Sequence, residues 1–140
     1  MPVFEVHLAE GQHTAEQQQE LLRRSAALYA EVLGSPVDRV RVLVTLHRPE
    51  LFFAGGKLLS EDPRPAPYFS FVVLEGRPVE ERQRLLAGFT DLLVEVLGVE
   101  RSRVRGGCRR IAPEDWAIGG TPASVLRAAE IEARAKAAEA

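Results

Sequence analysis

The sequence has few of the residues that form covalent or metal cross-links. Cys108 is the only cysteine among 140 residues, which excludes an internal disulfide framework and a cysteine-based metal site. The histidines, His7, His13 and His47, do not show the spacing of metal ligands. We therefore expect no metal site, and we expect Cys108 to be a structural thiol in a strand.

Long apolar segments and an excess of one charge are also absent. No apolar run approaches the roughly 18 residues of a membrane-spanning helix, and the first residues lack the charged-then-apolar pattern of a signal peptide. Lys and Arg number 18 against 20 Asp and Glu, a net charge of −2, so the chain has no overall attraction to nucleic acid or membrane. The composition is that of a globular protein, for which we expect a single compact domain. Without a signal peptide or a long apolar run, we expect it in the cytoplasm.

What the sequence does contain is an internal repeat. At an offset of 64 residues, residues 2–56 align with residues 66–120 without a gap. Identities cluster where residues 31–34 match 95–98 and where 39–41 match 103–105. Two copies of one supersecondary unit are expected. The predicted organisation is a first unit at 1–60, a linker at 61–67, a second unit at 68–120 and a helical tail at 121–140.

Each copy has the pattern of a β-α-β unit. Residues 3–8 alternate as a strand, Thr14 is suited to cap a helix ending near Gly34, and residues 40–46 alternate again. A turn at 49–56 leads to a short hairpin, and residues 121–140 are expected to form one capped helix. The strands of such a unit are parallel with a right-handed crossover. The predicted fold is α+β, a four-stranded sheet with two helices on one face.

Two features of this sheet lead to further expectations. Gly106 and Gly107 replace β-branched residues in the last strand, which predicts a bulge there. The sheet face opposite the helices is left uncovered, and an uncovered apolar face predicts self-association.

Pro2 is the candidate for chemistry. Once Met1 is removed, its nitrogen is a secondary amine and a base, whereas an internal proline nitrogen is an amide without basicity. An amino-terminal amine of pKa about 8 is mostly protonated at neutral pH, and cationic neighbours favour its neutral form. Such cations would also bind an anionic substrate. The candidates are Arg77, Arg41, Arg105, Arg109 and Arg110.

Two stretches resemble the tautomerase superfamily. Residues 2–11, Pro-Val-Phe-Glu-Val-His-Leu-Ala-Glu-Gly, are similar to the opening of 4-oxalocrotonate tautomerase, and residues 113–124 are the most specific match. The resemblance implies a fused two-unit subunit, a homotrimer, and no metal or organic cofactor. It also implies that Pro2 is catalytic and that Arg77 and one of Arg41 or Arg105 bind the substrate. The aromatic residue that makes the site apolar in the family corresponds to Phe52 and Trp116. In the first copy, Gln12 replaces the arginine that Arg77 supplies in the second.

The predicted function is therefore a cofactor-independent keto–enol tautomerase, an isomerase. It would act on a small unsaturated 2-hydroxy or 2-oxo acid with Pro2 as general base. Two alternatives stay open. Asp38 and His47-Arg48-Pro49 resemble malonate semialdehyde decarboxylase, a relative that acts on a 3-oxo acid. A non-catalytic, cytokine-like trimer is the other. Tyr29 either packs in the core or reaches the site. No nucleic-acid or membrane partner is expected.

Overall fold

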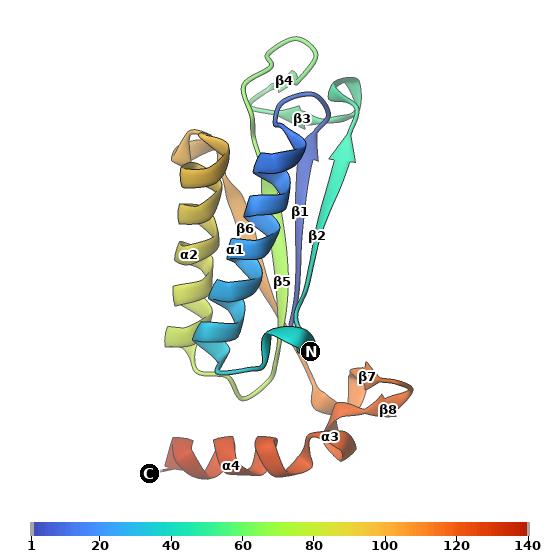
Figure 1. Cartoon of the computed structure of the whole chain (residues 1–140), viewed down its shortest axis with the longest axis vertical. Coiled ribbons are helices and arrows are strands. Elements are labelled where there is room, and N and C mark those ends of the chain that lie inside the picture. The colour runs from blue at the N-terminus through green and yellow to red at the C-terminus, as the bar shows by residue number, and fades with distance from the viewer. Residues whose placement is uncertain (1, 140) are drawn as a thin grey trace.

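The computed structural model describes residues 2–139 and has one four-stranded sheet with two long helices on a single face (Figure 1). The strand order is β2-β1-β5-β6. Strands β1 and β2 are parallel, β5 and β6 are parallel, and the central pair β1 and β5 is antiparallel. The predicted α+β fold is confirmed. Its main elements are β1 (Val3–Ala9), α1 (Ala15–Leu33), β2 (Arg41–His47), β5 (Tyr68–Leu74), α2 (Val79–Leu97) and β6 (Arg105–Ile111).

Short elements lie at the two ends of the sheet (Figure 1). One end carries the hairpin β3 (Phe53–Ala54) and β4 (Lys57–Leu58). The other end carries β7 (Ala117–Ile118), β8 (Thr121–Pro122), α3 (Ala123–Leu126) and α4 (Ala128–Glu139). The expected single helix from residue 121 is wrong, because Thr121 and Pro122 pair with β7. Four 3-10 turns precede strands or hairpins: η1 (Val37–Arg39), η2 (Pro49–Leu51), η3 (Arg101–Arg103) and η4 (Pro113–Asp115).

Helix α1 begins and ends as its sequence predicts. The Thr14 side chain accepts a hydrogen bond from the Gln17 backbone N–H, and the Gln17 side chain accepts one from the Thr14 N–H. This reciprocal pair satisfies two donors that the first turn of a helix leaves free. Gly34 ends the helix with φ of 62°, a left-handed conformation that favours glycine.

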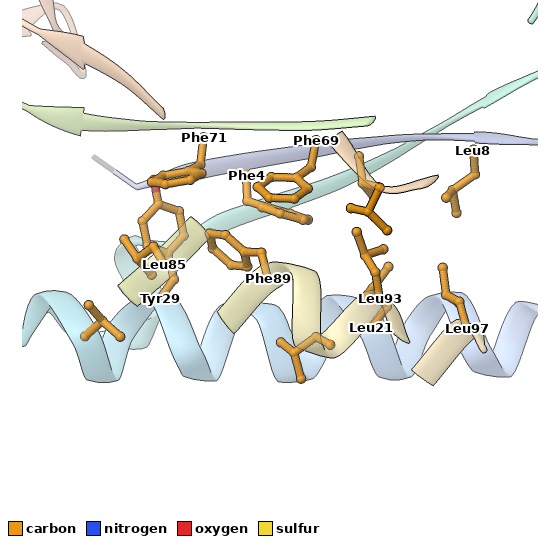
Figure 2. Close-up of a cluster of buried hydrophobic side chains, with 14 of the residues drawn as sticks. Phe4, Leu8, Leu21, Tyr29, Phe69, Phe71, Leu85, Phe89, Leu93 and Leu97 are labelled. Carbon is orange, nitrogen blue, oxygen red and sulfur yellow. The ribbon is translucent and has the colours of Figure 1, made fainter. Parts of the chain in front are cut away.

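The core lies between the sheet and the two helices. Figure 2 shows Phe4, Phe69 and Phe71 pointing from the sheet toward Tyr29 and Phe89 on the helices. These positions alternate along their strands, so one sheet face is buried and the other is left open. None of the helices within residues 2–139 is both long enough and apolar enough to span a membrane.

The number of residues that separates corresponding positions of the two units is 65 in their first strands and 64 in their second strands. Val3 pairs with Arg41, and Tyr68 pairs with Arg105. The second strands therefore correspond at an offset of 64, but the first strands correspond at 65. The gap-free alignment is wrong because the turn between β1 and α1 holds one extra residue. A shift within the strand would move every side chain to the other face, whereas a turn absorbs an insertion. Pro2 thus corresponds to Pro67, and Gln12 to Arg77.

Strand β6 pairs with β5 without interruption, from Arg105 opposite Tyr68 to Ile111 opposite Leu74. The bulge expected at Gly106 and Gly107 is therefore wrong. Gly106 has a different physical role, since a Cβ atom there would lie 2.1 Å from the ring of Phe69. The missing side chain makes room for that ring.

Candidate active site

Pro2 lies immediately before β1 and is buried. Its carbonyl oxygen accepts a hydrogen bond of 2.9 Å from the backbone N–H of Arg41, the first residue of β2. Because β1 and β5 are antiparallel, the start of β1 lies at the end of β5. The topology therefore holds Pro2 at a sheet end that receives residues from both units. Met1 lies outside the described residues.

A cavity of about 410 Å³ opens beside the start of β1. Its walls include Val3, Asp38, Arg39, Arg41 and Trp116. Among residues 2–139, no hydrogen bond or ion pair engages the Arg41 guanidinium, so this side chain is free to bind an anion. Trp116, which belongs to the second unit, forms an apolar wall of this cavity. Two of the predicted binding residues thus share a cavity next to Pro2.

Arg77 lies at the same end of the sheet, in the turn between β5 and α2, but its guanidinium is already bound. Its Nη1 donates to the Leu33 carbonyl oxygen at 2.8 Å and pairs with Glu81 Oε1 at 3.2 Å. The side chain is only 12% exposed. It lines a neighbouring cavity of about 420 Å³, and Arg39 lines both cavities. Arg77 therefore adjoins the Pro2 cavity without lining it.

Positive charge accumulates around this second cavity. Burial, and then the charge of Arg77, lower the pKa of the Arg134 guanidinium on α4. The Arg134 Nη1 atom is buried and has no hydrogen-bond partner among the described residues. Glu130 offsets part of this charge through two hydrogen bonds of 3.1 Å from Arg39, which lower the pKa of its carboxyl group. The whole end of the sheet favours an anionic ligand.

Arg105 and Phe52 lie at the opposite end of the sheet, around Pro67. Within one chain they do not line the cavity beside the start of β1. The uninterrupted register also places the remaining candidates: Arg109 lies opposite Val72 on the open face, and Arg110 opposite Val73 on the helix face. Of the arginines considered in the second strands, Arg41 is the one whose cavity borders the first residue of β1.

Tyr29 contacts the start of β1, next to Pro2, from within the core. Its side chain is fully buried, and its hydroxyl group donates to the Val72 carbonyl oxygen and lies 3.4 Å from that of Val3. Burial raises the pKa of this hydroxyl group far above its usual value, so it stays protonated. Of the two interpretations of Tyr29, the structure therefore favours the core. The hydroxyl group ties the start of β1 to β5.

Arg39 and Arg127 also line the cavity beside Pro2, and sequence reasoning did not select either as a binding residue. A signal for Arg39 was present, because Arg39-Val40-Arg41 is repeated as Arg103-Val104-Arg105. Nothing in the sequence indicates Arg127, which reaches the cavity through the fold of the tail. Within residues 2–139, no three His, Cys, Asp or Glu side chains are placed to hold a metal ion.

Comparison with known proteins identifies the family. The family described as tautomerase enzyme matches residues 2–62 and again residues 67–125. The chain belongs to this family. The two matches cover both repeated units, so the prediction of a fused two-unit tautomerase superfamily member, and with it of an isomerase, is confirmed.

This tautomerase family member is similar both to a relative about half its length and to structures of nearly its own length. The 2-hydroxymuconate tautomerase of Pseudomonas sp. (strain CF600) is 36% identical over 61 residues, which are 44% of this chain and 95% of the relative. That length is about one unit. A native fused 4-OT structure is 27% identical, with a TM-score of 0.82 over 89% of this chain and 98% of that chain. R7 fused 4-OT, an asymmetric trimer, is also 27% identical, with a TM-score of 0.79 and the same coverage.

Proposed function

We propose that this protein is a keto–enol tautomerase that acts on a small unsaturated 2-hydroxy or 2-oxo carboxylic acid, with Pro2 as its general base. The observation that carries the proposal is the buried Pro2 beside a cavity holding Arg41 and Trp116. The relative named 2-hydroxymuconate tautomerase supports this substrate class. The remaining cations at this end of the sheet suit a substrate that carries a carboxylate.

The reaction is an internal proton transfer. After removal of Met1, the neutral amine of Pro2 takes the proton of the 2-hydroxyl group, and the electron pair of that O–H bond forms the 2-oxo group. The double bonds shift, and the protonated amine returns the proton to a conjugated carbon. Arg41 binds substrate oxygen atoms and stabilises the negative charge that develops on them. Trp116 keeps one side of the cavity apolar, which strengthens that interaction.

We also propose that the protein assembles as a homotrimer. R7 fused 4-OT, which shares the fold over 89% of this chain, is a trimer. The open sheet face carries the exposed side chains Leu43 and Tyr68, and burial of such a face between copies removes apolar surface from water. The trimer is the assembly in which three such faces cover one another.

Replacement of Pro2 tests the mechanism. Ketonisation of 2-hydroxymuconate and phenylenolpyruvate is followed by ultraviolet absorbance for the wild type and for Pro2→Ala. A positioned general base contributes roughly 10²–10⁴-fold, so we expect a loss of turnover of about that size with unchanged circular dichroism. Near-normal turnover of Pro2→Ala would contradict the proposal.

A matched control keeps the proline and removes only its basicity. A glycine inserted between Met1 and Pro2 converts the proline nitrogen to an amide after Met1 is cleaved. We expect this chain to be as inactive as Pro2→Ala. Intact mass shows beforehand that the active wild type lacks Met1, and a chain that retains Met1 and is inactive favours the non-catalytic interpretation.

Decarboxylation of a 3-oxo acid is the second candidate, because Asp38 lines the cavity beside Pro2. The other residues that resemble the decarboxylase, His47-Arg48-Pro49, are far from this cavity, because His47 is opposite Ala9 at the far end of β1. The decarboxylase requires a protonated Pro2 that polarises the carbonyl group, whereas the tautomerase requires a neutral one. A pH–rate profile distinguishes them: activity that rises as the amine loses its proton supports the tautomerase, and activity that falls supports the decarboxylase.

A further inference from the structure

At the opposite end of the sheet, the fold contains another cavity, distinct from the two described above, that resembles the one beside Pro2. It has a volume of about 400 Å³ and lies where β5 and β6 begin, near the β3–β4 hairpin (Figure 1). Its walls include Phe52, Phe53, Tyr68, Arg103 and Arg105 together with Pro67. We call it the Pro67 pocket, and we call the cavity lined by Val3, Asp38, Arg39, Arg41 and Trp116 the Pro2 pocket.

The two pockets are built from corresponding residues. At the offset of 64, Arg41 corresponds to Arg105 and Trp116 to Phe52, and at 65 Val3 corresponds to Tyr68. Pro67, which lines its own pocket, corresponds to Pro2, which directly precedes Val3. The antiparallel pairing of β1 with β5 turns the second unit around, so the equivalent pocket forms at the opposite end of the sheet. The Pro67 pocket is therefore not part of the Pro2 pocket within one chain.

Backbone carbonyl groups orient both guanidinium groups of the Pro67 pocket. Arg105 Nη1 donates to the carbonyl oxygens of Ser102 at 2.7 Å and Val104 at 2.9 Å. Arg103 donates through Nε and Nη2 to the carbonyl oxygens of residues 65 and 64, each at 3.1 Å. Each guanidinium group has five N–H donors, so donors remain for a ligand. Anchored in this way, the two cations bind a planar carboxylate with less loss of side-chain entropy.

The Pro67 pocket has lost the carboxylates of its counterpart. Ser102 occupies the position of Asp38, and within residues 2–139 no carboxylate forms an ion pair with Arg103 as Glu130 does with Arg39. The nearby carboxylate of Asp62 is bound by Arg64 at 2.8 Å. Two guanidinium groups and no carboxylate line the Pro67 pocket, whereas three guanidinium groups and the carboxylate of Asp38 line the Pro2 pocket. The lining of the Pro67 pocket thus has a net positive charge, which favours an anion.

The Pro67 pocket has no base. The Pro67 nitrogen is the amide nitrogen of the bond to Ala66 and cannot accept a proton. The counterpart of Arg77 is Gln12, a neutral side chain that donates to the Pro63 carbonyl oxygen at 2.7 Å. Two guanidinium groups and aromatic walls suit one carboxylate attached to a planar unsaturated group. We propose that the Pro67 pocket binds a small planar monocarboxylate and holds it without chemical conversion.

The test counts bound carboxylates. Isothermal titration of the full chain with trans-cinnamate, which has no enol or keto group, is expected to show two molecules per chain. Arg105→Ala and its matched variant Arg41→Ala are each expected to bind one, and the double variant none. Neutral cinnamamide is expected to bind roughly ten- to a hundredfold more weakly, because hydrogen bonds to a charged group are lost. Phe52→Glu, which places a carboxylate in the pocket, is a second way to remove the Pro67 site should Arg105→Ala not fold.

The outcomes separate this proposal from the proposed activity. One cinnamate per chain that survives both Arg105→Ala and Phe52→Glu would mean that the Pro67 pocket is empty. One per chain that is lost in Arg105→Ala and also in Arg41→Ala would mean a single site shared between chains, which also overturns the proposal. Two sites in a protein that lacks ketonisation activity would leave the Pro67 pocket established and reject the tautomerase mechanism.

Discussion

Gly106 and Gly107 are adjacent in β6, but their surroundings differ. A Cβ atom at Gly106 would lie 2.1–2.4 Å from three atoms of the Phe69 ring, whereas one at Gly107 would meet nothing within 4 Å. Neither glycine has a positive φ, so alanine is compatible with the backbone at both positions. The two positions therefore separate a packing requirement from the flexibility of glycine.

We expect Gly106→Ala to destabilise the protein by about 1–3 kcal/mol, because the fully buried Phe69 ring must move within a packed core. Gly107→Ala is the matched control and should be neutral or stabilising by up to about 1 kcal/mol, since alanine restricts the unfolded chain. Urea unfolding at one fixed chain concentration measures both changes. Equal effects of the two substitutions would show that Phe69 does not require the missing side chain.

At the scale of elements, α4 is held to the first unit by an arginine from η1. Arg39 donates two hydrogen bonds of 3.1 Å to the carboxylate of Glu130. These hydrogen bonds lower the pKa of Glu130, so its charged form stabilises the docked helix. That stabilisation is complete above the ordinary pKa range of glutamate and is lost as the pH falls through the lowered value. The same helix brings Arg134 toward Arg77, so its docking affects the charge near the Pro2 pocket.

We expect Glu130→Gln to release α4 without unfolding the sheet. Half-exposed ion pairs are worth at most about 1 kcal/mol, which corresponds to roughly fivefold faster amide hydrogen exchange in residues 128–139. Glu132→Gln is the matched control, because Glu132 pairs with Lys136 inside the same helix. Acidification should lower the protection factors of these amides in the wild type, which are corrected for the intrinsic pH dependence of exchange, toward those of Glu130→Gln. An unchanged exchange rate at residues 128–139 would show that the pair does not hold the helix.

At the scale of the whole molecule, the two sheet faces differ in what covers them. Helices α1 and α2 bury one face, while the other presents Leu43, of which 49% is exposed, and Tyr68, of which 42% is exposed. On the same open face His7 Nδ1 and His47 Nε2 are 2.8 Å apart. This face is the surface through which the proposed trimer would form.

Leu43→Asp is expected to weaken the trimer, because it places a charge within the apolar part of the open face and directly opposite Glu5. Ala87→Asp, on the exposed side of α2, is the control and should remain trimeric. Sedimentation equilibrium should give three times the 15.4 kDa chain mass for the wild type and for Ala87→Asp. A wild type that sediments as a single chain would reject the trimer, and a fully trimeric Leu43→Asp would reject this face as its interface.

The sequence by itself determined the repeated β-α-β units, the helix capped by Thr14 and Gly34, and the family. These features are local: alternation and capping depend on neighbours within a few residues. It also predicts Arg41 and Trp116 as binding residues, and the two line one cavity.

Only the tertiary structure decided how the candidate residues are grouped. Antiparallel pairing of β1 with β5 brings Trp116 of the second unit to the cavity beside the start of β1 and places Arg105 and Phe52 in the cavity that Pro67 lines. An alignment of the two copies cannot distinguish these groupings, because corresponding residues look alike wherever they lie. The extra residue in the turn before Thr14 is indicated in the sequence, where Glu10-Gly11 matches Glu75-Gly76 at an offset of 65, but only the strand register establishes it.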